Sequence, residues 1–147
     1  MSDRVTVTLH HLVARLDAFA EEYLQRHHGV SFATFSFVAV AADLGEADIT
    51  TLARALGVSK AAVSKRVPAL VADGWVQTRP DPDHGRRVLV SPTGRALLLM
   101  RDAGGALEVE FTDLLADPRL IAGGVDADDL NRQLNLLLTV VSEKGPS

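Results

Sequence analysis

The sequence predicts a mainly helical α+β fold that contains one small β-hairpin. Apolar residues recur at intervals of three and four over most of the 147 residues, which is the spacing of one helix face. Two β-type runs interrupt this pattern on either side of a tip rich in Pro, Asp and Gly, and such an arrangement is typical of a hairpin. The length is that of one domain with a sizeable core.

The composition excludes several classes of protein. Hydrophobic residues make up 47% of the chain and charged residues 23%, close to the averages for globular proteins. The chain has no cysteine, which excludes disulfides, thiolate metal sites and thiol catalysis. The apolar runs are far shorter than the roughly 18 residues of a membrane span, and no signal peptide is recognisable. We therefore expect a cytoplasmic protein with no membrane partner.

The N-terminal part of the chain predicts two helices. A helix over residues 5–27 carries its apolar side chains on one face and stops at Gly29. Ser31 is placed to cap a second helix, which ends at Gly45.

The next segment predicts a helix-turn-helix. A short helix over residues 51–56 starts from either Asp48 or Thr50, and Gly57 allows a tight turn after it. Ser59 caps the following helix, which runs to about residue 72. We expect Val58 to fill the angle between the two helices. Pro68 lies inside the second helix, where it removes one backbone hydrogen bond and suggests a kink.

A hairpin and two further helices complete the chain. Strands are expected over residues 75–79 and 87–91, with the tip between them. Ser91 and Pro92 predict the start of a long helix that reaches about residue 116 and loosens at Gly104 and Gly105. A loop follows, and Asp126 starts the last helix.

The charge is distributed unevenly along the sequence. The net charge is −4, which argues mildly against a nucleic-acid partner. Residues 48–95, however, carry eight basic and four acidic side chains, whereas the rest of the chain carries seven basic and fifteen acidic ones. A basic module of charge +4 thus lies within an acidic frame of charge −8.

The helix-turn-helix followed by a basic hairpin is a winged-helix arrangement, and it predicts DNA binding. The second helix would enter the major groove with its N-terminus, where hydroxyls, cations and an alanine methyl can contact phosphates and base edges. An arginine at the hairpin tip can enter the minor groove. The predicted DNA contacts are Ser59, Lys60, Ala61, Ser64, Lys65, Arg66, Arg79, Arg86 and Arg87.

The order of these elements resembles the MarR (multiple antibiotic resistance regulator) family of winged-helix transcription factors. The resemblance covers nearly the whole chain and is strongest over residues 49–94. Where the family closes its wing with Leu-Thr-x-x-Gly, this chain has the looser Val-Ser-Pro-Thr-Gly at residues 90–94. Where the family wing has Asp-x-Arg, Asp83 and Arg86 are one residue further apart, so the sequence leaves open whether Arg86 or Arg87 enters the groove.

The resemblance implies a homodimer that binds an inverted-repeat operator in double-stranded DNA. The wide apolar faces of the terminal helices agree with a dimer, since each needs a partner to cover it. We expect a helical dimerisation region at residues 1–29 and 117–147, a winged helix-turn-helix domain at 30–95 and a connecting helix at 96–116. The family also implies repression that a small aromatic or anionic effector relieves. The expected pocket residues are His10, Leu12, Phe32, Phe35 and Phe37.

Two other functions remain open at this level. A winged helix can serve as a protein–protein interaction module, although the cations on the second helix of the helix-turn-helix and on the hairpin favour DNA as the partner. An enzyme is disfavoured because the chain has no Cys nucleophile, no GxxxxGK[ST] loop and no HExxH motif. Adjacent histidines flank the first helix, but neighbouring residues on a helix diverge by about 100°. We therefore expect no metal site and no cofactor.

Overall fold

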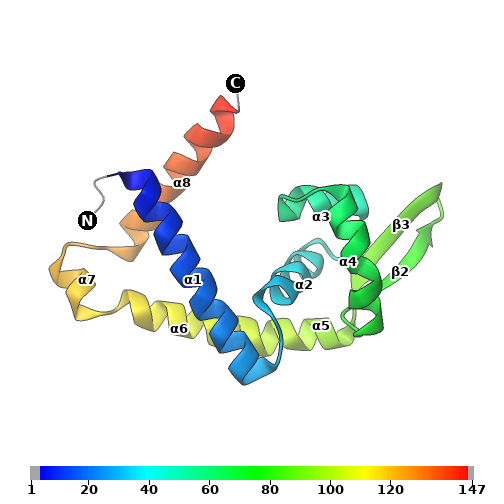
Figure 1. The fold of residues 1–147 in the computed structure, drawn as a ribbon, viewed down its shortest axis with the longest axis horizontal. Coiled ribbons are helices and arrows are strands. Elements are labelled where there is room, and N and C mark those ends of the chain that lie inside the picture. Colours follow the sequence, from blue (N-terminus) through cyan, green and yellow to red (C-terminus); the bar gives the residue numbers. More distant parts are fainter. Residues whose placement is uncertain (1–3, 146–147) are drawn as a thin grey trace. The chain divides into compact units, whose positions relative to one another are not determined.

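The computed structural model describes residues 4–145 and has the expected α+β architecture (Figure 1). The ends of the expected dimerisation region, residues 1–3 and 146–147, lie outside the described part of the chain. The N-terminal elements are α1 (Val5–His28), α2 (Phe32–Leu44), β1 (Ala47–Asp48), α3 (Ile49–Leu56), α4 (Lys60–Ala72), β2 (Val76–Asp81) and β3 (His84–Pro92). They are followed by α5 (Gly94–Leu99), a π-helical turn (Met100–Gly104), α6 (Gly105–Leu115), α7 (Pro118–Ala122) and α8 (Ala127–Lys144). Among these helices none is long and apolar enough to cross a membrane.

The chain divides into two compact units, Met1–Leu107 and Glu108–Ser147. The first unit contains both the helix-turn-helix and the hairpin. The second contains α7 and α8. The expected grouping of residues 1–29 with 117–147 concerns a dimer and stays a prediction.

Polar side chains cap the helices of the first unit where the sequence indicated. The Ser31 hydroxyl accepts a hydrogen bond from the Thr34 amide at 3.0 Å, and the Ser59 hydroxyl accepts one from the Ala62 amide at 3.1 Å. Of the two candidates for the start of α3, Asp48 is the cap, since its carboxylate accepts from the Thr51 amide at 2.7 Å. These bonds satisfy amides that lack a partner within the helix and so fix where each helix begins.

Gly57 makes the turn between α3 and α4 in a left-handed conformation, with φ of 69°. Its amide and that of Val58 bond back to carbonyls of the last turn of α3. Ala53 is buried and lets the two helices approach closely. The expected role of Val58 is wrong, because its side chain is 47% exposed and does not fill the angle.

A small antiparallel sheet joins the helix-turn-helix to the hairpin. Its strand order is β1-β3-β2, so β3 lies in the middle. Ala47 pairs with Val90 and Asp48 with Leu89, which attaches the segment between α2 and α3 to the hairpin. The sequence analysis did not predict β1, which is only two residues long.

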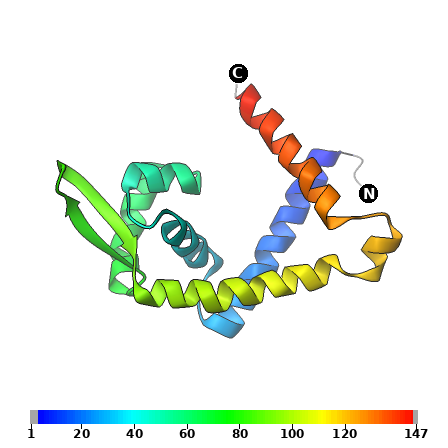
Figure 2. The same ribbon diagram turned by 180° about the vertical axis from the view of Figure 1, so that it is seen from behind.

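The hairpin is longer than expected and carries a bulge near its tip. β2 and β3 turn at Pro82 and Asp83 and project beyond the helices (Figure 2). Pro80 pairs with Val88 but Asp81 pairs with His84, so Gly85, Arg86 and Arg87 bulge out of the ladder. A bulge re-aims the side chains it contains. Arg86 and Arg87 therefore lie where the strand departs from regular pairing.

One hydrophobic core holds the first unit together. Leu52 from α3, Val63 from α4 and Val90 from β3 are each at most 1% exposed, and they form one cluster with Phe37 and Val38 of α2. Burying side chains of this size stabilises a fold by about 1.5–3 kcal/mol each. The core thus fixes the position of α4 relative to the base of the hairpin.

The helix that follows the hairpin loosens near Gly104 as predicted but starts later than predicted. It begins after Thr93 rather than Ser91, because β3 continues to Pro92, which pairs with Val76. The Thr93 hydroxyl donates to the Gly74 carbonyl at 2.6 Å and accepts from the Ala96 amide. The loosening expected near Gly104 takes the form of a π-helical turn. Part of the expected loop after residue 116 is the short helix α7.

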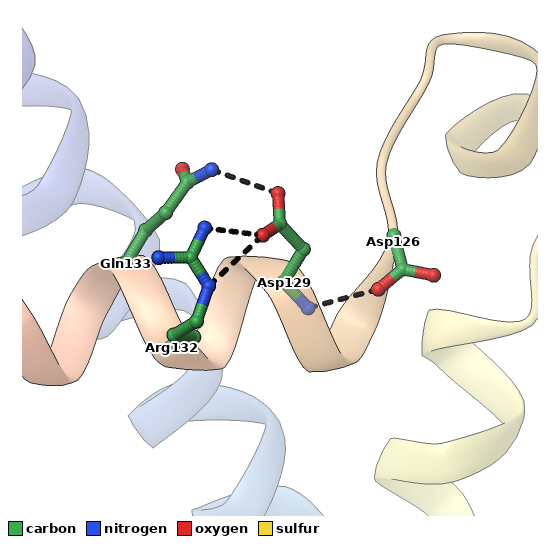
Figure 3. Close-up of polar contacts among 4 residues, drawn as sticks. All are labelled: Asp126, Asp129, Arg132 and Gln133. Carbon is green, nitrogen blue, oxygen red and sulfur yellow. Dashed lines mark hydrogen bonds and ion pairs between the residues drawn. The ribbon is translucent and has the colours of Figure 1, made fainter.

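In the second unit, α8 begins at Asp126 as predicted. The Asp126 carboxylate accepts from the Asp129 amide at 2.8 Å, and the Asp129 carboxylate in turn accepts from Arg132 and Gln133 (Figure 3). Six large apolar side chains of α8 are 38–63% exposed; they are Leu134, Leu136, Leu137, Leu138, Val140 and Val141. A helix with this much exposed apolar surface needs a partner.

Replacing Gly57 by Ala should destabilise the protein by roughly 1 kcal/mol, because an L-residue is strained at positive φ. Gly105→Ala is a matched control, since Gly105 has helical φ of −64° and a Cβ at either position meets nothing within 4 Å. The control should stabilise the protein by about 0.5–1 kcal/mol. Urea denaturation measures both changes, and shifts of the same sign would contradict the assignment of Gly57 to the left-handed turn.

Candidate nucleic-acid interface

The N-terminal half of α4 presents one exposed polar face. Lys60, Ala61, Ser64 and Lys65 are all exposed there, next to the capping residue Ser59. The opposite face is buried through Val63, Val67 and Leu70. The alternation of buried and exposed positions follows the helical period, so the core holds these polar groups on the solvent side.

Arg66 lies at the edge of this face and is engaged within the protein. Its guanidinium donates a hydrogen bond to the Ala33 carbonyl of α2 at 3.0 Å. It also lies over the ring of the fully buried Phe37, 5.2 Å from the ring centroid. A cation over an aromatic face is attracted by the ring quadrupole. Arg66 thus ties α4 to α2.

Beside the C-terminal half of α4 is an open apolar groove of about 480 Å³. It lies between α4 and the hairpin and is lined by Ile49, Ser64, Val67, Pro68, Val71, Thr78 and Val88. Pro68 is within α4 and has no N–H to donate to the Ser64 carbonyl. Because Ser64 lines the groove and also belongs to the exposed polar face of α4, the groove borders the face that is predicted to contact DNA.

Two of the three wing arginines are paired with carboxylates at β1, one in the strand and one directly before it. Arg79 donates to both Glu46 carboxylate oxygens, at 2.7 and 2.5 Å. Arg87 lies 3.3 Å from the carboxylate of Asp48. Residues 4–145 contain no ion-pair partner for Arg86, which is exposed in the bulge.

These pairs change the ionisation of the carboxylates. The double hydrogen bond from Arg79 holds the pKa of Glu46 below its usual value, and Glu46 raises the pKa of Arg79. The hydrogen bond from the Thr51 amide is the main cause of a lowered pKa at Asp48, and Arg87 adds to it. Both carboxylates are therefore charged at neutral pH.

Asp81 shapes the turn at the wing tip. Its carboxylate accepts a hydrogen bond from the amide of Asp83 at 2.9 Å, which is an Asx turn. The backbone of the tip is thus held by a side chain of the hairpin itself.

The expected effector residues lie in two places. His10 and Leu12 are exposed in the N-terminal half of α1, whereas Phe32, Phe35 and Phe37 are in α2. Phe37 is fully buried beneath Arg66, and Phe32 and Phe35 pack against the same core. Residues 4–145 contain no group of His, Asp and Glu side chains placed to hold a metal ion.

Sequence reasoning missed the carboxylates that pair with the wing. Glu46 and Asp48 belong to the connection between α2 and α3, 33 and 39 residues before their arginine partners. The one available signal was Asp48 itself, which already carried the capping pattern of a helix start.

The fold and this site define a winged-helix protein. Residues 28–87 match the model of the MarR family. A mutant MarR from E. coli, solved in complex with operator DNA, is similar with a TM-score of 0.74 and 23% identity, covering 93% of each chain. Sco3205 from Streptomyces coelicolor, solved in complex with DNA and described as a MarR family transcriptional regulator, has a TM-score of 0.80 and 18% identity. That match covers 97% of this chain and 87% of the other.

A third similar structure is the transcriptional regulator BldR from Sulfolobus solfataricus, with a TM-score of 0.72, 20% identity and coverage of 96% and 100% of the two chains. No curated protein matches the sequence. The expected resemblance to the MarR family and the winged-helix fold are both confirmed, and the similarities are to transcriptional regulators rather than to enzymes.

Replacing Arg66 by Ala should lower the free energy of unfolding by about 1–2 kcal/mol, because it removes one hydrogen bond and the contact with Phe37. Lys65→Ala is the matched control. Lys65 is the neighbouring exposed cation, and its loss should change stability by less than about 0.5 kcal/mol. Urea denaturation of both variants checks this, and equal effects would show that Arg66 does not hold α4 to α2.

Proposed function

We propose that this chain is a homodimeric, sequence-specific DNA-binding transcriptional regulator, and that it acts as a repressor released by a small-molecule effector. One observation carries the proposal. A core-anchored helix exposes short polar and cationic side chains beside a hairpin whose Arg86 has no ion-pair partner among residues 4–145, and both the helix and Arg86 belong to the segment that matches the MarR family model. Two structures similar to this chain were solved with DNA.

The polar face of α4 suits the major groove. Amides at the helix start and the hydroxyl of Ser64 can bond phosphates or base edges, and Lys60 and Lys65 can reach phosphates or guanine. The methyl of Ala61 can contact a thymine methyl. In this arrangement α4 determines the sequence preference, because base edges in the major groove differ for each base pair.

The wing suits the minor groove, and Arg86 is the arginine that enters it. Arg86 has no ion-pair partner among residues 4–145, whereas Arg87 is paired with Asp48. An unpaired guanidinium gives up no protein contact when it binds phosphates or a narrow A·T-rich groove. We therefore propose Arg86 rather than Arg87, between which the sequence left the choice open.

A second copy of the chain is the proposed cover for the terminal helices. Within α8 the apolar residues fall into two strips, one through Leu134, Leu138 and Val141 and the other through Leu136 and Val140. On α1, Leu12 and Val13 are about half exposed. A two-fold dimer would place two copies of α4 about one DNA turn apart and read an inverted repeat.

Release by an effector is supported by the resemblance to the family. We propose a small aromatic or anionic molecule, with His10, Leu12, Phe32 and Phe35 as candidate contacts. Phe37 is better explained as core, since it is fully buried. Titrating a panel of small aromatic acids against the complex with upstream DNA tests this part, and unchanged affinity across the panel would contradict it.

Arg86→Ala should weaken binding to operator DNA and lower the slope of log affinity against log salt by about one, because one phosphate contact is lost. Arg15→Ala removes the same charge from α1 and should leave the slope unchanged. Fluorescence anisotropy over a salt series measures both variants. The wing assignment fails if Arg86→Ala retains the wild-type slope.

Replacing Leu138 by Asp should dissociate the dimer and weaken operator binding, because a charge would be buried in the apolar interface. Thr139→Asp is the control, because Thr139 is exposed on α8 between the two apolar strips and the change adds the same charge outside them. Sedimentation velocity measures the oligomeric state. A wild-type chain that sediments as a monomer at micromolar concentration would contradict the dimer.

A further inference from the structure

The pair formed by Glu46 and Arg79 spans the whole width of the small sheet. Arg79 on β2 pairs with Leu89 on β3, and Leu89 pairs with Asp48 on β1. Residues that pair directly in antiparallel strands project to the same face. Arg79 therefore lies on the face of Leu89 and Asp48, and its guanidinium reaches across β3 to Glu46, the residue that precedes β1.

A second ion pair supports the same face. Arg87 lies in the bulge of β3, and its guanidinium is 3.3 Å from the carboxylate of Asp48, which projects to this face. Asp48 also caps α3 through the Thr51 amide. Two carboxylates next to the start of the helix-turn-helix thus hold one arginine from each strand of the hairpin.

The hairpin has little else to fix its direction. In β2 only Val76 is buried and in β3 only Val90, while the residues nearer the tip are mostly exposed. A two-stranded hairpin without packing is marginally stable in water. A bidentate arginine–carboxylate pair constrains both distance and orientation, which a single point charge does not.

We propose that Arg79 and Glu46 form a clamp that sets the direction of the wing, and that Arg79 is a positioning residue rather than a phosphate contact. This inference rests on the proposed DNA-binding function and gives Arg79 a different role from the one that the sequence predicted. The clamp holds the base of the hairpin so that Arg86, in the bulge, meets the minor groove while α4 lies in the major groove.

The two possible roles of Arg79, as part of a clamp or as a phosphate contact, predict opposite changes in DNA affinity when Glu46 is replaced. On charge alone, removing a carboxylate and freeing a cation near DNA should tighten binding. If Glu46 positions the wing, Glu46→Gln should instead weaken operator binding roughly three- to tenfold, as expected for loss of an exposed but bidentate pair. The salt slope should stay at the wild-type value because no phosphate contact is lost.

Arg79→Lys separates the two roles further. Lysine keeps the charge for a phosphate but cannot bond two carboxylate oxygens at once, so the clamp predicts a loss similar to that of Glu46→Gln. The reversed pair, Glu46→Arg with Arg79→Glu, should recover most of the affinity. The matched controls are the single variants Glu22→Gln and Arg26→Lys. Glu22 and Arg26 form an exposed ion pair on α1, and its loss should not change DNA affinity.

The experiment measures operator affinity and salt slope for these variants, with thermal midpoints to confirm that each one folds. Tighter binding by Glu46→Gln, or wild-type affinity in Arg79→Lys, would overturn the clamp. Hydrogen exchange of the β2–β3 amides without DNA is the second readout and should quicken in Glu46→Gln. If exchange is faster in Glu46→Gln but the wild-type protein binds no DNA, the clamp is retained and the proposed function is rejected. If exchange is unchanged in Glu46→Gln, the clamp is rejected.

Discussion

The pairing of Ala47 and Asp48 with β3 is the contact on which the rest of the helix-turn-helix and its wing depends. It joins the start of the helix-turn-helix to the middle strand of the sheet, and Ala47 and Val90 are both buried there. Because α3 begins directly after β1 and α4 follows one tight turn later, the position of the recognition helix is set from the same point as the wing. The two elements that we propose contact DNA, α4 and the wing, therefore share one anchor, and this would favour simultaneous contact with adjacent grooves.

Five basic residues of α4 and the wing fall into two groups, according to whether their side chains bond to other parts of the protein. Lys60, Lys65 and Arg86 are exposed, and the structure gives them no ion pair within residues 4–145. Arg66 and Arg79 instead bond to groups of α2 and of the connection after it. The net charge of +4 over residues 48–95 therefore does not show which cations are free, because Arg79 is neutralised by Glu46, which lies outside that segment. The acidic frame would still disfavour DNA on the other faces.

Local features of this fold could be predicted from the sequence, and long-range ones could not. The capping roles of Ser31, Ser59 and Asp126 were predictable because each depends only on a hydrogen bond between a side-chain oxygen and an amide three residues later. β1 was missed because a strand of two residues is too short to show an alternating pattern. The cap of α5 is Thr93 rather than Ser91 because strand pairing extends β3 to Pro92. The exposed face of α4 follows from helical period, but the partners of Arg66 and Arg79 lie 33 residues away and needed the tertiary structure.

The account holds that a two-fold dimer reads DNA with α4 in the major groove and the wing in the flanking minor groove. Chemical footprinting of the operator with the full-length protein tests this most directly, using methylation of guanine N7 for the major groove and hydroxyl radicals for the minor groove. The predicted result is methylation protection at two symmetric half-sites about one DNA turn apart, with minor-groove protection outside each of them. Protection of a single unsymmetric site, or hydroxyl-radical protection without any protected guanine in a half-site that contains one, would contradict it.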